Sequence, residues 1–330
     1  MISVIVCSRS ERDFEALKNQ LRENAGAETE YIRIPNENGH RSIFQAYNEG
    51  IRQAKGEWLC FAHEDIRIHT KNWAGRCERH FAEDPALGLL GVVGGCFFPS
   101  DGDWRAFPGC RRGHLLQRVN TLEATPRAVT APIGGRNFPG RGEVAAIDGL
   151  WMVLRADLGL RFDEDSYRGF DLYDSDLSLQ VRQAGAKVCV CGDLLIEHFS
   201  YGNFSPSYFS ALEVCLKKWQ GLLPLNFDAS IDPKADHSAL LQAFYEERMA
   251  RFSAREKLLR GEVPNEAKEV AAVREDILLF HHVYEKTSPT LADSLREIDR
   301  SQREGWITPA EARSFRWKSY LYHLFPRKRV

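Results

Sequence analysis

The chain is 330 residues long, with 43% hydrophobic and 27% charged residues, which excludes a disordered, collagen-like or coiled-coil protein. Its net charge of −2 excludes the general basic excess that nucleic-acid-binding proteins carry. Eight scattered cysteines without a Cys-x-x-Cys pair predict neither a zinc site nor a disulfide framework, and no stretch is apolar over the length of a membrane span. We therefore expect a cytoplasmic protein that binds no nucleic acid.

Strand and helix patterns alternate in the first part of the chain. Apolar runs and helical periodicity predict a strand at 2–7, a helix at 14–21, a strand at 30–35, a helix at 43–54 and a strand at 57–62. Strands joined by helices imply right-handed crossovers and a parallel sheet, whose ligands lie at the carboxyl ends of the strands. We expect the functional site just after Cys7 and Ala62.

The pattern changes twice further along the chain. After a helix at 73–81 and a strand at 87–93, residues 104–142 are rich in Gly, Pro and Arg and predict a long loop or a loose hairpin. Regular patterns then predict strands at 143–148, 150–154, 187–191 and 194–196 and a helix at 177–183. From Pro206 onward we expect helices and no further strand. The sequence thus predicts an α/β domain at 1–222, with a mostly parallel central sheet flanked by helices, and an all-helical extension at 223–330.

Two adjacent carboxylates, Glu64 and Asp65, follow the third predicted strand abruptly. Hard divalent cations prefer carboxylate oxygens, so Asp65 is the first predicted metal ligand, with Glu64 beside it. A solvated turn or a helix cap is the simpler interpretation of such a pair. His198 leaves a later strand next to an acidic residue, and as a neutral imidazole it would complete the coordination of a metal at Asp65. A lone histidine is more often structural.

Asp174 and Asp176 stand where the helix predicted at 177–183 begins. An aspartate at this place caps the helix and interacts favourably with its dipole. A carboxylate held at a rigid helix start and facing a pocket is also a good general base. The residues alone leave these two interpretations open.

Taken together, these segments resemble the GT-A glycosyltransferases of family two, in its bacterial glycosyltransferase-like branch. The resemblance rests on Ala46–Ile51, Ala54–Leu59, His63–Ile66, Tyr173–Leu179, and His198 with Ser200, which occur in the family's order. It covers residues 2–219. His63 replaces the family's usual first acid of the metal motif, and Tyr173 replaces its usual glutamate, which puts the contact with the donor ribose and the tuning of the base in question.

The resemblance implies a GT-A fold with a donor half at 1–98 and an acceptor half at 99–222. It implies an inverting transfer from a nucleotide-diphosphate sugar, expected to be a UDP-sugar, to a hydroxyl of a glycan or lipid-linked acceptor. Mn²⁺ or Mg²⁺, held by Asp65 and His198, would stabilise the leaving diphosphate. Asp174 would be the catalytic base that removes the proton of the acceptor hydroxyl.

The resemblance also implies two groups of binding residues. The donor would contact Cys7, Ser8, Arg9, Asn48, His63, Glu64 and Asp65. The sugar or the acceptor would contact Asp148, Gly149, Trp151 and Asp176. Trp151 offers a stacking face for a sugar, although a place in the core is an equally good interpretation.

Two basic segments lie outside these motifs. Residues 104–142 contain seven arginines, no lysine and one acid, a local net charge of +6, which suits a phosphate group of the donor or the acceptor. A solvated loop whose charge is balanced by acids elsewhere is the alternative. Residues 315–329 carry five aromatic residues and five Lys or Arg without an acid. They predict either peripheral contact with the inner face of the cytoplasmic membrane or docking onto the protein itself.

Other protein classes fit the sequence less well. The departures at His63 and Tyr173 leave open a non-catalytic protein that binds a nucleotide-sugar or a carbohydrate on a degenerate transferase fold. A nucleotide-sugar pyrophosphorylase would need a Gly- and Lys- or Arg-rich phosphate loop after the first strand, and residues 8–13 do not supply one. A Rossmann dehydrogenase is excluded because the glycines at 88–95 do not lie between the first strand and the first helix.

Overall fold

The computed structural model describes residues 1–113, 115–120, 128–133, 140–200, 204–287 and 290–324. The chain divides into two compact units. The first comprises Met1–Leu116, Pro132–Phe199 and Pro206–Phe244, and the second comprises Gln117–Ala131, Ser200–Ser205 and Tyr245–Val330. Each unit has a hydrophobic core of its own.

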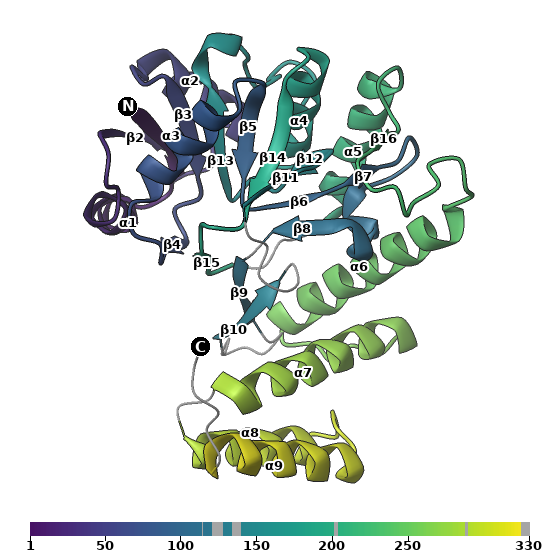
Figure 1. The fold of residues 1–330 in the computed structure, drawn as a ribbon. Helices are drawn as coiled ribbons and strands as arrows, with labels where there is room; N and C mark the ends of the chain where they lie inside the picture. The colour runs from purple at the N-terminus through teal and green to yellow at the C-terminus, as the bar shows by residue number, and fades with distance from the viewer. Residues whose placement is uncertain (114, 121–127, 134–139, 201–203, 288–289, 325–330) are drawn as a thin grey trace. The chain divides into compact units, whose positions relative to one another are not determined.

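A seven-stranded sheet forms the centre of the first unit (Figure 1), with the strand order β11-β14-β5-β13-β3-β1-β2. The strands are β1 (Ile2–Ser8), β2 (Thr29–Pro35), β3 (Trp58–Ala62), β5 (Leu87–Gly91), β11 (Arg141–Glu143), β13 (Trp151–Arg155) and β14 (Lys187–Cys191). The pairs β1–β2, β1–β3 and β5–β14 are parallel, whereas β13 runs antiparallel to β3 and β5, and β11 runs antiparallel to β14. The α/β class is confirmed. The sheet is mixed instead of mostly parallel, because β11 and β13 run antiparallel to their neighbours.

Helices flank this sheet, and their ends agree with local sequence signals. They are α1 (Glu11–Glu23), α2 (Ile43–Gln53), α3 (Trp73–Glu83), α4 (Tyr173–Gln183) and α5 (Pro206–Trp219). Ser10 caps α1 by accepting a hydrogen bond from the Asp13 amide, and Ser42 forms a reciprocal capping box with Gln45 at the start of α2. The predicted helix starting at Pro206 is confirmed, because proline fits the first turn of a helix.

Short strands connect the larger elements of the first unit. A three-stranded sheet contains β12 (Ala146–Ile147), β6 (Val93–Gly95) and β8 (Arg111–Gly113), and β4 (Ile66–Ile68) pairs with β15 (Ile196–His198). Strands β9 (Leu115–Asn120) and β10 (Ala128–Ile133) are neighbours within the segment expected to be a loop or a loose hairpin. The expectation of no strand after Pro206 was wrong: β16 (Leu225–Asn226) pairs with β7 (Phe97–Phe98). A strand of two residues gives no periodic signal in the sequence.

Aromatic side chains fill both faces of the sheet. On one face, the ring of Trp151 meets that of Trp73 edge to face, with the centroids 5.0 Å apart. On the other face, Tyr47 and Tyr173 lie in an aromatic cluster with Phe61 and Phe162. This second cluster fixes the start of α4 against the carboxyl end of β3, where the functional site was predicted.

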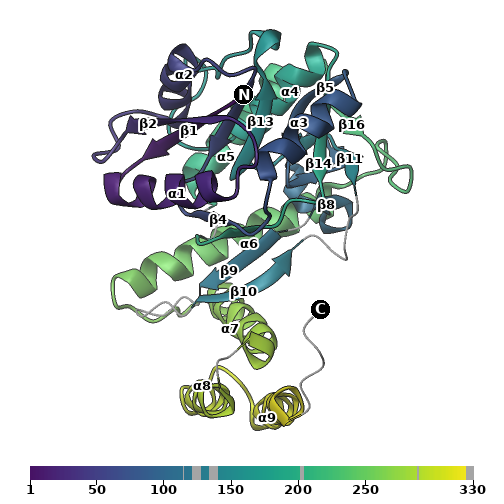
Figure 2. The same ribbon diagram turned by 60° about the vertical axis from the view of Figure 1, so that its left-hand side comes forward.

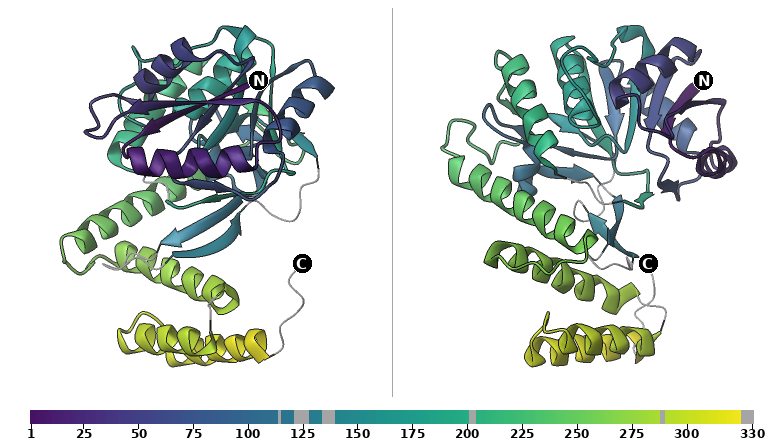
Figure 3. Two further views of the ribbon diagram at one scale, coloured as in Figure 1. Left: turned by 90° about the vertical axis from the view of Figure 1, so that its left-hand side faces the viewer. Right: turned by 180° about the vertical axis from the view of Figure 1, so that it is seen from behind.

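The second unit consists mainly of helices, which Figures 2 and 3 show in green to yellow. They are most of α6 (Ser238–Leu259), α7 (Ala267–Thr287), α8 (Leu291–Arg303) and α9 (Pro309–Leu324). Their core contains Ala254, Val273, Ile277, Ile298, Ile307, Ala312 and Phe315. Helices α8 and α9 lie side by side, joined by a buried contact between the hydroxyls of Ser294 and Ser319 (2.6 Å). Among the described residues, no helix has the length and apolar character needed to cross a membrane.

Candidate functional site

Backbone pairing brings His198 to the turn that follows β3. Strand β15 runs antiparallel to β4 with His198 opposite Ile66, and the Phe199 amide donates to the Asp65 carbonyl (2.9 Å). On the other side of the turn, the His63 amide donates to the Leu150 carbonyl (3.1 Å). Residues 135 positions apart in sequence therefore share one turn at the carboxyl end of β3.

Three side chains converge there. His198 Nε2 lies 3.6 Å and His63 Nδ1 lies 3.8 Å from Asp65 Oδ1, and the two ring nitrogens are 3.4 Å apart. Their candidate ligand atoms all lie within 4.8 Å of one another. Two imidazole nitrogens and one carboxylate oxygen are a donor set that can hold a divalent transition-metal cation. The residues present therefore fit a metal, with His63 as a third candidate ligand.

His63 is oriented by the hydroxyl of Tyr173, which lies 2.6 Å from its Nε2 atom. If Nε2 carries the proton and donates to this hydroxyl, the Nδ1 lone pair faces Asp65 and His198. Burial and the neighbouring His198 lower the pKa of His63. Its ring is therefore neutral at pH 7, as a metal ligand must be.

Glu64 points away from this group. Its carboxylate accepts from the Arg9 amide (3.0 and 3.2 Å) and forms an ion pair with the Arg9 guanidinium (3.6 Å). Arg9, Glu64 and Asp65 line a cavity of about 380 Å³ together with Arg67 and Phe199. The structure thus brings three of the predicted donor-binding residues to one cavity beside the histidines.

Other residues in the predicted donor group have local structural partners. Ser8 is fully buried, donates to the Ser10 carbonyl and accepts from Arg33. Asn48 is buried in α2, where its side-chain amide both accepts from and donates to the Phe162 backbone (2.9 and 2.8 Å). Cys7 is half-buried, and burial raises the pKa of its thiol. None of these three side chains lines the cavity described above.

Asp174 occupies the first turn of α4 and is almost fully buried. Its Oδ2 atom accepts from the Arg105 guanidinium (2.7 Å) and from the Gly149 amide (3.0 Å), and Oδ1 accepts from the Ser175 amide (2.6 Å). Burial raises the pKa of Asp174, and the Arg105 charge opposes this shift without cancelling it. The side chain is therefore a carboxylate with more basic character than an exposed aspartate.

Arg105 organises the acidic groups around Asp174. It lies in a short 3₁₀ turn (Trp104–Ala106), and its guanidinium stacks over the Trp104 ring. The guanidinium donates a hydrogen bond to the Tyr208 hydroxyl (3.1 Å) and lies 3.7 Å from the Asp148 carboxylate. Burial alone would raise the pKa of Asp148, but its favourable electrostatic contacts, above all with the Arg105 charge, outweigh burial and lower this pKa. The sequence contains Arg105 as one of seven arginines in residues 104–142. Its spacing in the sequence does not distinguish it from the other six.

The remaining predicted sugar or acceptor residues divide between site and core. Asp148 has a side chain 34% exposed and lies between Arg105 and the histidines. A Cβ atom at Gly149 would collide with the Tyr173 hydroxyl, so glycine is required by this close approach. Trp151 is 1% exposed, which leaves no ring face for a sugar. Asp176 is also 1% exposed and accepts from Lys218, Trp219 and other groups inside the unit.

The described arginines of the segment 104–142 have protein partners. Arg112 pairs with Asp228 (2.6 Å), Arg141 pairs with Asp84 (3.4 Å), and Arg111 donates to the Arg105 carbonyl (2.7 Å). Arg127 and Arg136, and the side chain of Arg118, lie outside the described residues. Charge balance by neighbouring acids therefore accounts for Arg105, Arg112 and Arg141.

A second group with metal-ligand geometry, His80, Cys191 and Asp193, has a different character. Asp193 accepts from His80 (2.8 Å) and from Arg79 (2.8 Å), and Arg141 lies 3.3 Å from the other ring nitrogen of His80. Arginine charges therefore occupy the place of a cation.

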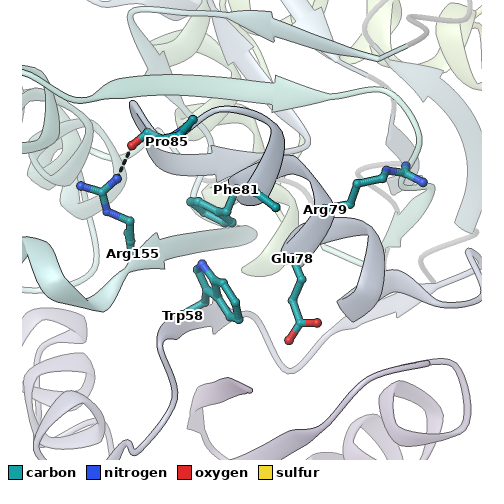
Figure 4. A pocket seen from close by; sticks show the side chains of 7 residues that line it. Trp58, Glu78, Arg79, Phe81, Pro85 and Arg155 are labelled. Carbon is teal, nitrogen blue, oxygen red and sulfur yellow. Dashed lines mark hydrogen bonds between the residues drawn. The ribbon is translucent and has the colours of Figure 1, made fainter.

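A cavity of about 470 Å³ lies at the opposite end of β3 (Figure 4). Trp58 and Phe81 form its apolar part, and Arg155, which donates to the Pro85 carbonyl, lies at its border. Because Trp58 begins β3 and Ala62 ends it, this cavity is separated from the histidines by the length of the strand. It brings together no group of metal ligands.

The family model of a glycosyltransferase-like family matches residues 3–203. The chain belongs to this family. The matched segment of this glycosyltransferase-like protein contains His63, Asp65, Asp148, Asp174 and His198. The predicted family resemblance is therefore confirmed. No curated protein matches the sequence.

Several solved structures are similar to the protein at low sequence identity. They include GalNAc-T7 with UDP, GalNAc and Mn²⁺ (12% identity, TM-score 0.44, 76% of this chain and 54% of that one). They also include TarS of S. aureus with UDP-GlcNAc (13%, 0.40, 99% and 93%) and a mannosyltransferase of Pyrobaculum calidifontis with GDP-Man and Mn²⁺ (11%, 0.40, 99% and 88%). The chain spans about half the length of the GalNAc-T7 chain.

Proposed function

We propose that this protein is an inverting glycosyltransferase that moves a sugar from a nucleotide-diphosphate sugar, expected to be a UDP-sugar, to an acceptor hydroxyl. The acceptor would be a glycan or a lipid-linked sugar. One observation carries the proposal: His63, Asp65 and His198 converge at the carboxyl end of β3, and Tyr173 links them directly to the turn of α4 that holds Asp174. A candidate metal group next to a candidate base supports a metal-assisted transfer.

A divalent cation, Mn²⁺ or Mg²⁺, would be held by Asp65 and His198, with His63 as a third ligand. When bound, such a cation supplies positive charge that stabilises a leaving diphosphate. The cavity lined by Arg9, Glu64 and Asp65 opens beside these ligands and would receive the nucleotide. Arg67, which also lines this cavity, offers a positive charge to an anionic donor, whereas Glu64 pairs with Arg9.

Asp174 would take the proton of the acceptor hydroxyl as that hydroxyl attacks the anomeric carbon. Its raised pKa favours proton uptake, and the Arg105 charge favours the ionised form that a base needs. A carboxylate oxygen has two lone pairs, so Oδ1, which accepts from the Ser175 amide, can accept a further hydrogen bond. Direct attack opposite the leaving diphosphate inverts the anomeric centre.

Calorimetry with a panel of nucleotide sugars, with and without Mn²⁺, tests the donor site. We expect one donor to bind in a metal-dependent manner, and we expect Asp65→Ala to abolish that dependence. Glu64→Gln is the matched control, because the Glu64 carboxylate faces Arg9 and should leave the metal dependence intact. Absence of metal-dependent binding for every donor would contradict the metal assignment.

A non-catalytic protein that binds a nucleotide-sugar is the second candidate. The burial of Asp174 and its three hydrogen-bond donors favour it, because a buried carboxylate held by several donors can be purely structural. The two functions differ in Asp174→Asn. If Asp174→Asn loses sugar transfer but keeps its donor affinity, the protein is an enzyme. If the wild type binds a donor tightly but transfers no sugar to any glycan or lipid-linked acceptor, it is a binding protein.

A further inference from the structure

Helix α9 has two apolar faces, and the second unit buries one of them. Phe315 and Ser319 face inward, where Phe315 belongs to the helical core and Ser319 bonds to Ser294 of α8. Trp317, Tyr320 and Leu321 face outward and are 65%, 41% and 41% exposed. Internal packing therefore accounts for one face of this helix and leaves the other to be explained.

The outward residues form a continuous stripe with a basic border. Arg313, Trp317, Tyr320 and Leu321 are spaced by four, three and one positions, so they lie on the same side of the helix. Lys318 flanks the stripe, and its ammonium lies over the Phe315 ring (5.6 Å). We call Arg313, Trp317, Tyr320 and Leu321 the outer stripe of α9.

The charge around this stripe has a single sign. The described residues 312–324 contain Arg313, Arg316 and Lys318 and no acid. Arg316 is neutralised by Asp299 of α8 (2.6 Å). Arg313 and Lys318 form no ion pair with an acid among the described residues. An apolar stripe bordered by uncompensated positive charge favours a partner that has an anionic surface and an apolar interior.

We propose that the outer stripe of α9 binds the surface of an anionic lipid bilayer. Tryptophan and tyrosine favour the boundary between headgroups and acyl chains, and each Lys or Arg near an anionic surface adds attraction. Leu321 adds apolar area that enters the acyl boundary. This proposal is independent of the sugar-transfer activity, and it would hold equally for a protein that only binds a nucleotide-sugar.

A second copy of the chain fits the stripe less well than a bilayer. A twofold interface uses the same surface of both copies, so Arg313 and Lys318 of both copies would be brought into one interface. Like charges brought together across an interface are strongly unfavourable. An anionic bilayer instead neutralises them.

Co-sedimentation of the full chain with lipid vesicles tests the proposal. We expect binding to vesicles of phosphatidylcholine mixed with phosphatidylglycerol, weakened by salt, and much weaker binding to phosphatidylcholine alone. Trp317→Ser combined with Leu321→Ser should reduce the partition coefficient by roughly tenfold or more, because two apolar side chains no longer leave water. Arg313→Gln combined with Lys318→Gln should reduce it by about fivefold per charge removed.

Val263→Ser is the matched control. Val263 is 76% exposed in the same unit but stands between Glu262 and Glu266, which an anionic surface repels. We expect its vesicle binding to equal that of the wild type. We expect all variants to unfold near the wild-type temperature, because the changed side chains lie at the surface. The proposal is overturned if the wild type binds neither kind of vesicle, or if the Trp317 and Leu321 changes leave vesicle binding intact. It is also overturned if those changes convert a dimer into a monomer.

Discussion

Asp174 and Asp176 stand two positions apart in the first turn of α4, yet they face different surroundings. Asp174 faces the sheet, where it meets Arg105 and the Gly149 amide beside the partly exposed Asp148. Asp176 faces the body of the unit, where it accepts from Lys218 (2.8 Å) and the Trp219 indole (2.8 Å). The same residue type in the same turn therefore has two different environments, and environment decides whether a carboxylate serves chemistry or packing.

Replacement of Asp174 has the largest expected effect. Asp174→Asn keeps the shape of the side chain but removes the proton acceptor, so we expect kcat for sugar transfer to fall by roughly 10²- to 10⁴-fold. The donor affinity should stay within a factor of a few, because the donor cavity is lined by other residues. Steady-state transfer kinetics and donor calorimetry on the same preparation measure both. Unchanged kcat would move the base to another group.

Asp176→Asn should affect stability instead of transfer. The change removes the negative charge to which Lys218 and the Trp219 indole donate hydrogen bonds. We expect a loss of about 2 kcal/mol in the free energy of unfolding. Chemical denaturation measures this loss. The kcat of the folded fraction should remain at the wild-type value, and a large fall in kcat at unchanged stability would instead assign Asp176 to the acceptor site.

Arg105→Gln tests how the environment of Asp174 is tuned. Arg105 lowers the pKa of Asp174 against the raising effect of burial, so its removal should raise this pKa further. A base works only when it is ionised, and activity should therefore fall at a higher pH than in the wild type as the solution is acidified. The pH profile of kcat/KM measures this shift of the acidic limb toward neutral pH.

The same variant has a defined effect on stability. A buried carboxylate without its cation is costly, on the order of 3 kcal/mol at neutral pH. Because the folded-state pKa of Asp174 is raised, the folded state binds a proton more readily than the unfolded state as pH falls. The destabilisation should therefore shrink in mildly acidic solution, which thermal unfolding at two pH values detects. A destabilisation that does not depend on pH would mean that Arg105 acts through packing alone.

Several of these features were predictable from the sequence, each for a physical reason. The carboxylates after β3 and at the start of α4 stand out because polar residues interrupt apolar or helical periodicity there. The family motifs predicted that His198 would join Asp65, which the antiparallel pairing of β15 with β4 accomplishes. Arg105 could not be chosen among seven loop arginines, because the contacts that distinguish it join residues far apart in the chain. Trp151 was ambiguous for the opposite reason, since an apolar strand residue reveals its burial only when the sheet is assembled.

Replacement of Tyr173, which stands in the same turn of α4 and contacts a candidate metal ligand, has the smallest expected effect. Tyr173→Phe keeps the ring in its aromatic cluster but removes the hydroxyl that orients His63 (2.6 Å). Partners of metal-binding histidines typically contribute 10- to 100-fold to metal affinity, and we expect a loss of roughly this size for Mn²⁺ by calorimetry.

Tyr47→Phe is the control. Tyr47 lies in the same aromatic cluster, with its ring centroid 5.8 Å from that of Tyr173. The hydroxyl next to His63 Nε2 belongs to Tyr173 and not to Tyr47. Equal Mn²⁺ affinity in both variants would show that the Tyr173 hydroxyl does not orient a ligand. A loss confined to Tyr173→Phe would assign three neighbouring side chains of one helical turn to three tasks: orienting a ligand, taking a proton and holding the fold.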